Sequence, residues 1–175
     1  MANKATYNQE SIEVLKGADR VRKRPAVIFG SDGIEGCEHS VFEIISNSVD
    51  EAREGFGNTI TVTRFEDKSV EVQDQGRGIP VEYNQKEKLT FCELYAGGKY
   101  KTNDGGSYQY SLGTNGLGLC ATQYASEYME AEIHSNGFCY HLNFKGGKPV
   151  GDMIKEPYNK KDTGTRIKRR QDLKV

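Results

Sequence analysis

Residues 39–52 predict a helix with two unlike faces. With 100° per residue and Glu43 at zero, His39 falls at about −40°, Asp50 at about −20° and Asn47 at about +40°. The opposite face is apolar and comprises Val41, Ile45 and Ala52, flanked by Phe42, Ile44 and Val49. An imidazole, a carboxamide and two carboxylates therefore gather on one side of a single rigid element.

The polar face contains no Lys or Arg between His39 and Ala52, although basic residues are usual on an ordinary surface helix. A base, an amide that can bind a metal and a second acid on one helix suit metal-assisted hydrolysis. The alternative is a polar face that is merely solvated, because short acidic helix faces are common. The helix alone leaves both interpretations open.

Asp74 comes at the end of a predicted β-hairpin. Residues 59–66 and 69–73 alternate in polarity and are joined by a turn at 67–68. After Asp74 the chain runs Gln-Gly76-Arg-Gly78-Ile-Pro, and glycines at such a place let backbone approach a bound ring closely. A carboxylate fixed at the strand end can accept a hydrogen bond from an exocyclic amine. A plain turn is the alternative.

Residues 95–122 are rich in glycine and lead into an apolar run at 117–125 that predicts a helix. Glycines before a helix expose amide N–H groups that can bind an anion such as phosphate. The chain contains no GxxxxGK[ST] motif, so this is not a Walker A loop. A plain flexible segment is the other interpretation.

Together and in this order, the three segments resemble the GHKL ATPases. The first motif of that family, E-x-x-x-N-x-x-D, is similar to Glu43, Asn47 and Asp50, and the second, D-x-G-x-G, to the loop from Asp74. Within the family, residues 12–31 and the Thr-Gly-Thr at 163–165 resemble the B subunits of bacterial type II topoisomerases, DNA gyrase and topoisomerase IV. The resemblance covers essentially the whole chain.

The resemblance implies a role for each matching residue. Glu43 would be the general base for the attacking water, oriented by His39, and Asn47 would bind Mg2+. Asp74 would accept the adenine amino group, with Thr165 beside it. The other nucleotide-binding residues implied are Tyr7, Asp50, Gly76, Arg77, Gly78, Ile79, Pro80, Lys99, Gly113, Asn115, Gly116, Leu117, Gly118 and Leu119.

The implied fold class is α+β, a two-layer α/β sandwich with a mostly antiparallel mixed sheet and helices on one face. The implied domain is a single GHKL ATPase domain over 1–175, with an N-terminal dimerisation arm at 1–16 and an ATP lid at 96–119. The last part of that domain and the transducer domain that follows it in the family are expected to be absent.

The implied function is binding and hydrolysis of ATP with Mg2+, which drives changes of DNA topology through nucleotide-gated dimerisation. The implied partners are a second copy of the chain, the A subunit of the heterotetramer, and DNA through the full-length protein. Two alternatives remain: another GHKL branch, such as a mismatch-repair ATPase, a chaperone or a histidine kinase, or a module that binds nucleotide without hydrolysis. Glu43 argues against a kinase, which lacks that residue, and Val21-Arg-Lys-Arg-Pro25 argues against the other branches.

The length and the balanced charge of the chain indicate a single domain that does not bind duplex DNA by itself. The chain has 175 residues, with 24 basic and 25 acidic side chains and a net charge of −1. A DNA-gripping domain usually has a basic excess, so the basic clusters 20–24 and 166–170 are interpreted as structural or interdomain. The sequence has no long apolar run and no signal peptide, which indicates a cytoplasmic protein that is not membrane-bound. Its four cysteines lack metal-binding spacing and are expected to be reduced thiols.

Further elements and departures follow from the same pattern. Helices are expected at 11–23, 89–96 and 117–124, and strands at 127–135, 138–145 and 163–170, with an Asn-Gly turn at 136–137. Compared with the gyrase pattern, Ser46 replaces an Asp and Asn115 replaces a His. His141 is placed where the family carries an Arg at the pocket rim, and the connection from Pro80 to Gly97 is short.

Overall fold

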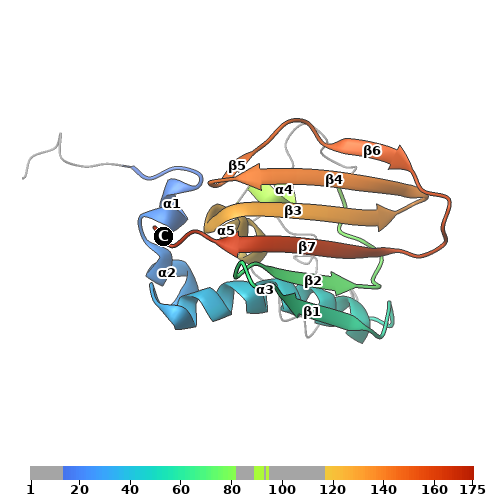
Figure 1. Cartoon of the computed structure of the whole chain (residues 1–175), viewed down its shortest axis with the longest axis horizontal. Helices are drawn as coiled ribbons and strands as arrows, with labels where there is room; N and C mark the ends of the chain where they lie inside the picture. The colour runs from blue at the N-terminus through green and yellow to red at the C-terminus, as the bar shows by residue number, and fades with distance from the viewer. Residues whose placement is uncertain (1–13, 82–88, 93, 95–116) are drawn as a thin grey trace, which may run out of the picture.

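The structure, a computed structural model, describes residues 14–81, 89–92, 94 and 117–175. One sheet forms a layer, and the long helix α3 and the shorter α5 lie against one of its faces (Figure 1). The helices are α1 (Asp19–Arg22), α2 (Pro25–Phe29), α3 (Ile34–Arg53), α4 (Leu89–Cys92) and α5 (Gly118–Tyr124). The strands are β1 (Ile60–Arg64), β2 (Val70–Asp74), β3 (Ser126–Ser135), β4 (Phe138–Lys145), β5 (Lys148–Pro149), β6 (Ile154–Pro157) and β7 (Gly164–Gln171).

The sheet has the order β1-β2-β7-β3-β4-β5, and β6 also pairs with β4. Each of these described pairs is antiparallel. The last strand in the sequence, β7, lies between the two hairpins β1–β2 and β3–β4 and joins them into one sheet (Figure 1). The predicted α+β class, with a largely antiparallel sheet and helices on one face, is confirmed.

A row of apolar side chains crosses the centre of the sheet. Val72 pairs with Ile167, Ile167 with Ala131, and Ala131 with Leu142, so that four strands contribute to one line. All four side chains are buried, and the residues that alternate with them face away from the helices. The core between the sheet and helices is completed by Ile44, Phe91, Leu119, Met129, Ile133, Tyr140 and Phe144.

Both hairpins form where the sequence predicts them. Ile60 pairs with Asp74 in the first, and Ser135 pairs with Phe138 in the second. Asn136 and Gly137 have φ values of 53° and 79°, as both central residues of a type I′ turn require. The predicted strand at 163–170 is present as β7, whereas the short strands β5 and β6 lack a pattern that predicts them.

In its described part, the helix predicted over 11–23 is confirmed only at Asp19–Arg22. α1 spans only Asp19–Arg22, because Gly17 has a φ of +50° and interrupts a helix there. Arg24 leaves the helical region before Pro25, as proline demands of its neighbour, and Pro25 then begins the separate helix α2. Residues 11–13 lie outside the described residues, as do 93, 95 and 96 of the helix predicted at 89–96.

The faces of α3 differ from those that periodicity predicts. Ser40, Ile44 and Ser48 are buried at intervals of four, whereas Phe42 is 54% exposed. The reason is that α3 packs on the sheet and also on α5, where Thr122 donates a hydrogen bond of 3.0 Å to the carbonyl oxygen of Ser40. Small serines on this face suit a close approach between the layers.

Candidate functional site

Asp74 is held at the end of β2 by three hydrogen bonds. Its Oδ2 accepts one from the hydroxyl of Ser48 on α3 at 2.7 Å. Its Oδ1 accepts from the backbone N–H groups of Gly76 at 2.9 Å and Thr165 at 3.0 Å. The carboxylate therefore ties together helix α3, the loop after β2 and the start of β7, and its orientation is fixed.

The loop after Asp74 is pinned to β7 by two threonines. The hydroxyl of Thr163 donates to the carbonyl oxygen of Gly76 at 2.6 Å, and the N–H of Ile79 donates to the hydroxyl of Thr165 at 3.2 Å. Gly78 has a φ of +83°, and a Cβ added there would lie 2.8 Å from the carbonyl oxygen of His134. The second glycine of the motif is thus required both by the turn and by close packing.

Arg77 closes the outside of this loop through Glu51. Its Nε and Nη2 donate to the two carboxylate oxygens at 2.9 Å each, and its backbone N–H donates to Oε2 at 3.1 Å. The guanidinium carbon also lies 4.0 Å from the ring centroid of Phe56. A bidentate pair of this kind fixes Arg77 against α3, at the mouth of the predicted purine site.

Glu43 and His39 form a pair on α3, one helical turn apart. His39 Nε2 lies 3.1 Å from Glu43 Oε1, and its Nδ1 lies 3.1 Å from the carbonyl oxygen of Phe29. Both ring nitrogens lie beside oxygen atoms, so the ring of His39 is oriented from both sides. Glu43 keeps about a quarter of its side chain exposed (28%), so that its carboxylate remains accessible.

The first turn of α5 lies directly against Glu43. A Cβ added to Gly118 would lie 2.6 Å from the carboxyl carbon of Glu43 and 3.0 Å from its Cβ. Only glycine allows the backbone to approach the carboxylate so closely. The end of the glycine-rich segment and the helix that carries Glu43 are thus brought together, although 75 positions separate them.

Asn47 and Asp50 occupy different environments. The amide nitrogen of Asn47 donates to the carbonyl oxygen of Glu43 at 3.1 Å, so its amide oxygen is directed away from that bond, as a metal ligand would be. Asp50 lies two turns after Glu43 on the same side of the continuous helix α3, as predicted, but it is 2% exposed, so this end of the polar face is covered. Ser46 is also buried and donates to the carbonyl oxygen of Phe42 at 2.8 Å.

The structure does not describe every predicted site residue. Leu117, Gly118 and Leu119 are described at the start of α5, and Ile79 and Pro80 follow the Asp74 loop. Outside the described residues lie most of the predicted lid, the arm up to residue 13, and the site residues Tyr7, Lys99, Gly113, Asn115 and Gly116.

His141 has Cys139 and Glu132 as neighbours. It is on the outer face of β4, where Nε2 lies 3.2 Å from Cys139 Sγ and Nδ1 lies 3.9 Å from Glu132. Asp74, in contrast, bonds to Ser48 on the helix side of the sheet. His141 and Ser48-bound Asp74 therefore point to opposite faces of the sheet, since successive strand residues alternate. The place of His141 at the rim of the nucleotide site stays a prediction.

A cavity of about 650 Å³ is present near the same end of the sheet. Glu132, His134 and Arg166 line it from the outer face, and the segment 158–163 closes it. Asp74 and Thr165 also border it, but Glu43 does not. The lining of this cavity includes no residue of α3.

Two residues of the site escaped prediction. Ser48 binds Asp74, and Glu51 binds Arg77. A serine and a glutamate on a helix do not by themselves indicate a functional site. Helical spacing predicts that Ser48 and Glu51 face the Asp74 loop only when β2 is known to pack beside α3.

Most of the chain matches one protein family. The profile of the family described as "Histidine kinase-, DNA gyrase B-, and HSP90-like ATPase" matches residues 33–173, which include both carboxylates and the Gly118 contact. The chain belongs to this ATPase family. Its α3, Asp74 loop and α5 are therefore parts of a GHKL-type ATPase domain.

Among curated proteins, this GHKL ATPase domain is similar to the B subunit of DNA topoisomerase 4 from several strains of Staphylococcus aureus. The proteins of strains Mu50, N315 and MW2 are each 41% identical to it, and each match covers 95% of this chain. The match covers 25% of each relative, so the chain spans about a quarter of their length. The domain is thus homologous to part of a topoisomerase B subunit.

The helices that the structure describes do not include a candidate membrane span. None of them combines the length and the apolar character that a membrane span requires.

Proposed function

We propose that this domain binds ATP between α3, the Asp74 loop and the first turn of α5, and hydrolyses it as the motor part of a type II DNA topoisomerase. The observation that carries the proposal is the fixed Asp74 carboxylate, which three donors orient while α3 extends from it toward Glu43. Five residues along a helix separate Ser48 from Glu43, or about 7.5 Å. That length suits a nucleotide whose base and phosphates lie along the helix.

In this proposal the adenine amino group donates to Asp74, and Thr165 and Ile79 border the ring. Gly76, Gly78 and Pro80 shape the loop, and Arg77, held by Glu51, covers its edge. Such a site discriminates among bases because Asp74, which is partly buried, would lose a hydrogen bond to any base that lacks the amino donor.

The phosphates would then lie near Glu43 and the amides of Leu117, Gly118 and Leu119. Asn47 would hold Mg2+ through its amide oxygen, and Asp50 would support α3 beside it from its buried position. Bound Mg2+ would neutralise phosphate charge. Glu43 would accept the proton of the attacking water, and His39 would hold the carboxylate in place. Tyr7, Lys99, Gly113, Asn115 and Gly116 belong to the same proposal.

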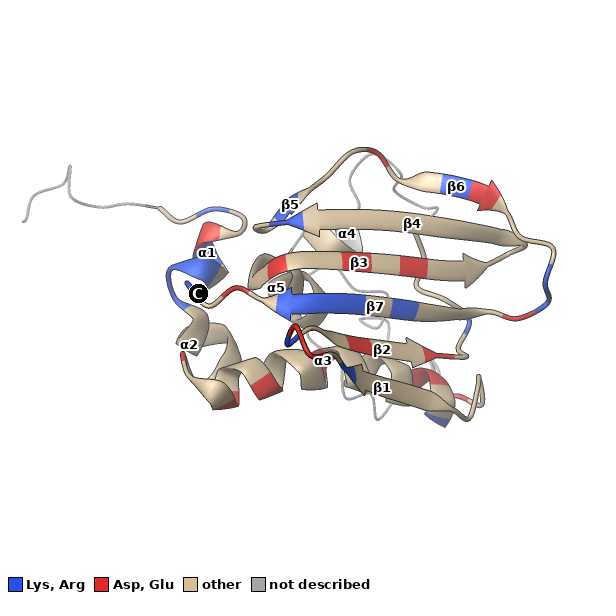
Figure 2. Cartoon of the chain, viewed as in Figure 1, with Lys and Arg blue, Asp and Glu red and all other residues tan. Residues whose placement is uncertain are grey.

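At the level of the whole protein, the proposed role is ATP-driven change of DNA topology through dimerisation of two copies. The partners would be a second copy by way of the 1–16 arm, an A subunit, and DNA through other parts of the protein. The basic cluster on β7 supports this division, because two of its arginines are paired within the sheet: Arg166 with Glu71 and Glu132, and Arg170 with Glu127. Acidic segments of β2 and β3 lie on either side of this basic strand (Figure 2). A cytoplasmic location is part of the same proposal.

Calorimetric titration with a non-hydrolysable ATP analogue, with and without Mg2+, tests the site. In Asp74→Asn an amide N–H₂ replaces one acceptor and faces donors from Ser48, Thr165 or adenine. We expect binding weakened by ~1–3 kcal/mol, about 5- to 150-fold. The control is Glu130→Gln, which neutralises an exposed carboxylate on the outer face of β3. Equal affinity in Asp74→Asn and wild type would exclude the adenine role.

A further inference from the structure

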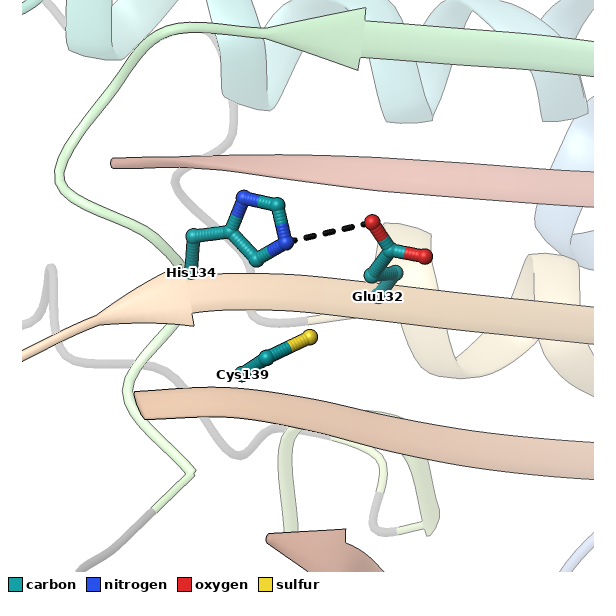
Figure 3. A group of neighbouring side chains, drawn as sticks. All are labelled: Glu132, His134 and Cys139. Carbon is teal, nitrogen blue, oxygen red and sulfur yellow. Dashed lines mark ion pairs between the residues drawn. The ribbon is translucent and has the colours of Figure 1, made fainter. Parts of the chain in front are cut away.

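Four potential metal ligands gather on the outer face of the β3–β4 hairpin. They are Glu132 and His134 on β3 and Cys139 and His141 on β4. Ligand atoms of Glu132, His134 and Cys139 all lie within 4.8 Å of one another (Figure 3). His141 is beside them, with Nε2 at 3.2 Å from Cys139 Sγ. The proposed ATPase function assigns no role to any of the four, although Glu132 and His134 line the cavity that Asp74 and Thr165 also border.

We propose that Glu132, His134, Cys139 and His141 form a binding site for one Zn2+ ion. A thiolate, two imidazoles and a carboxylate are the ligand types that Zn2+ takes in proteins, and the thiolate disfavours Mg2+ and Ca2+. Four such ligands complete a tetrahedral shell.

The spacing of the ligand atoms suits a single ion. With Zn–N and Zn–O of about 2.0–2.2 Å and Zn–S of about 2.3 Å, two ligands on one tetrahedral ion lie about 3.3–3.7 Å apart. His134 Nε2 lies 3.1 Å from Glu132 Oε1, and Cys139 Sγ lies 3.2 Å from His141 Nε2. Glu132 lies opposite His141 and His134 opposite Cys139 in the β3–β4 register, so the four side chains leave one face of the sheet at adjacent positions. Binding of one ion would require them to rotate toward a common centre.

Neighbouring side chains hold two of the ligands in position. Arg166 donates to Glu132 Oε2 at 2.6 Å and leaves Oε1 toward His134. Burial by itself would raise the pKa of Glu132, but the hydrogen bond from Arg166 lowers it overall, so the carboxylate is charged and ready to bind. The ring of His134 stacks on Tyr158 with centroids 4.0 Å apart, which fixes its plane. Supporting contacts of this kind raise metal affinity.

Cys139 must lose its proton when the ion binds. It is 7% exposed, and burial, with Glu132 and Glu156 nearby, raises the pKa of its thiol. Zn2+ would therefore replace the thiol proton, with formation of a Zn–S bond and release of H+ to solvent. The thiolate and carboxylate together balance the two charges of the ion. The cavity lined by Glu132 and His134 gives the ion a path from solution.

Such an ion would stabilise the part of the sheet that is next to the Asp74 loop. The site joins β3 to β4, and Tyr158, which stacks on His134, belongs to the segment that leads into Thr163 and Thr165. Both threonines hold the Asp74 loop. Zn2+ binding is therefore expected to stabilise the fold, since a ligand that binds only the folded state raises its stability.

The test uses the full chain without any histidine tag, stripped of metal by a chelator and titrated with Co2+ and then Zn2+. We expect one equivalent of Co2+ to produce the visible bands of a tetrahedral ion and a thiolate-to-cobalt charge-transfer band, both removed by one equivalent of Zn2+. Cys139→Ser should remove the charge-transfer band. His134→Gln and His141→Gln should each weaken binding at least about tenfold.

Cys37→Ser is the matched control, because it removes a half-buried thiol on α3, away from the cluster, and should leave the spectrum unchanged. Because Cys139→Ser could disturb folding, the two histidine variants give an independent readout at more exposed positions. Absence of a charge-transfer band in the wild type would overturn the proposal. So would equal affinity in wild type and both histidine variants, or loss of the band in Cys37→Ser.

Discussion

At the scale of single residues, the site depends on two carboxylates in opposite settings. Asp74 accepts hydrogen bonds from three donors, which leaves room for about one more in a fixed direction. Glu43 keeps part of its side chain exposed, and its Oε1 lies 3.1 Å from the imidazole of His39. A carboxylate that several donors hold in place suits recognition, whereas an accessible carboxylate with an oriented neighbour suits proton transfer.

Replacing Glu43 tests the second assignment. We expect Glu43→Ala, and the similarly sized Glu43→Gln, to bind an ATP analogue as the wild type does, while ATP turnover falls about 10²–10⁴-fold because no base remains. Turnover is measured by phosphate release and binding by calorimetry. Comparable hydrolysis by either variant would exclude Glu43 as the base.

Gly118 offers a test of the contact between α5 and α3. In Gly118→Ala the new methyl group meets the carboxyl group of Glu43, and relief requires a shift of one element. We expect a loss of ~1–3 kcal/mol in the free energy of unfolding, measured with denaturant, despite the better helix propensity of alanine. In the double variant Glu43→Ala/Gly118→Ala, most of that loss should disappear, and simple additivity would contradict the contact.

At the scale of elements, β7 carries a buried arginine on the helix side of the sheet. Arg169 is 2% exposed and donates to Ser126 at 2.8 Å, Ser40 at 2.5 Å and the side chain of Gln171. These acceptors are neutral, and burial lowers the pKa of Arg169 to about 10. The charge is therefore held at an energetic cost that its hydrogen bonds only partly offset.

Arg169→Met is expected to leave stability unchanged or to raise it by ~1–3 kcal/mol. The two serine hydroxyls keep their own acceptors, because Ser40 donates to the carbonyl oxygen of Cys37 and Ser126 to that of Thr122, each at 2.6 Å. Denaturant unfolding measures the effect, and Arg170→Met, on the outer face of the same strand, is the comparison. A large loss of stability in Arg169→Met would show that the hydrogen bonds outweigh the burial of the charge.

At the scale of the whole molecule, contacts between distant segments close the fold. Arg22 on α1 donates to Asp172 at 2.5 Å and to the carbonyl oxygen of Tyr124 at 2.9 Å. It thereby joins the first described helix to the segment after β7 and to the end of α5. A small apolar cluster lies beside these hydrogen bonds of Arg22. It consists of Val21, Phe29, Cys120, Ala121, Tyr124 and Ala125.

The ion pair between Arg22 and Asp172 predicts that the free energy of unfolding depends on pH. The hydrogen bond from Arg22 lowers the pKa of Asp172 below its ordinary value of 3.8. The ion pair therefore contributes its full stability above the ordinary pKa of Asp172. This stability is lost as the pH falls through the lowered pKa of the folded state. We expect Asp172→Asn to reduce the free energy of unfolding at about pH 7 by ~0.5–1.5 kcal/mol and much less at about pH 3, as measured by urea unfolding. An equal reduction at both pH values would refute the ion pair.

The sequence by itself determined the local elements and the identity of the motifs. Alternation in 59–73 and 127–145, with Asn136-Gly137 between two strands, specified both hairpins, because strand period and turn conformation depend on neighbouring residues alone. The order of Glu43, Asn47, Asp74 and the glycine-rich segment was enough to indicate the family.

Only the tertiary structure decided which faces are buried and which side chains meet. β7 lies between the two hairpins, so Thr165 reaches Asp74 across 91 positions of sequence. Burial of Asp50 and the placement of His141 beside Cys139 likewise depend on strand order and on the packing of α3 against α5. Contacts between distant segments are set by the sum of many weak packing terms, which no local pattern encodes.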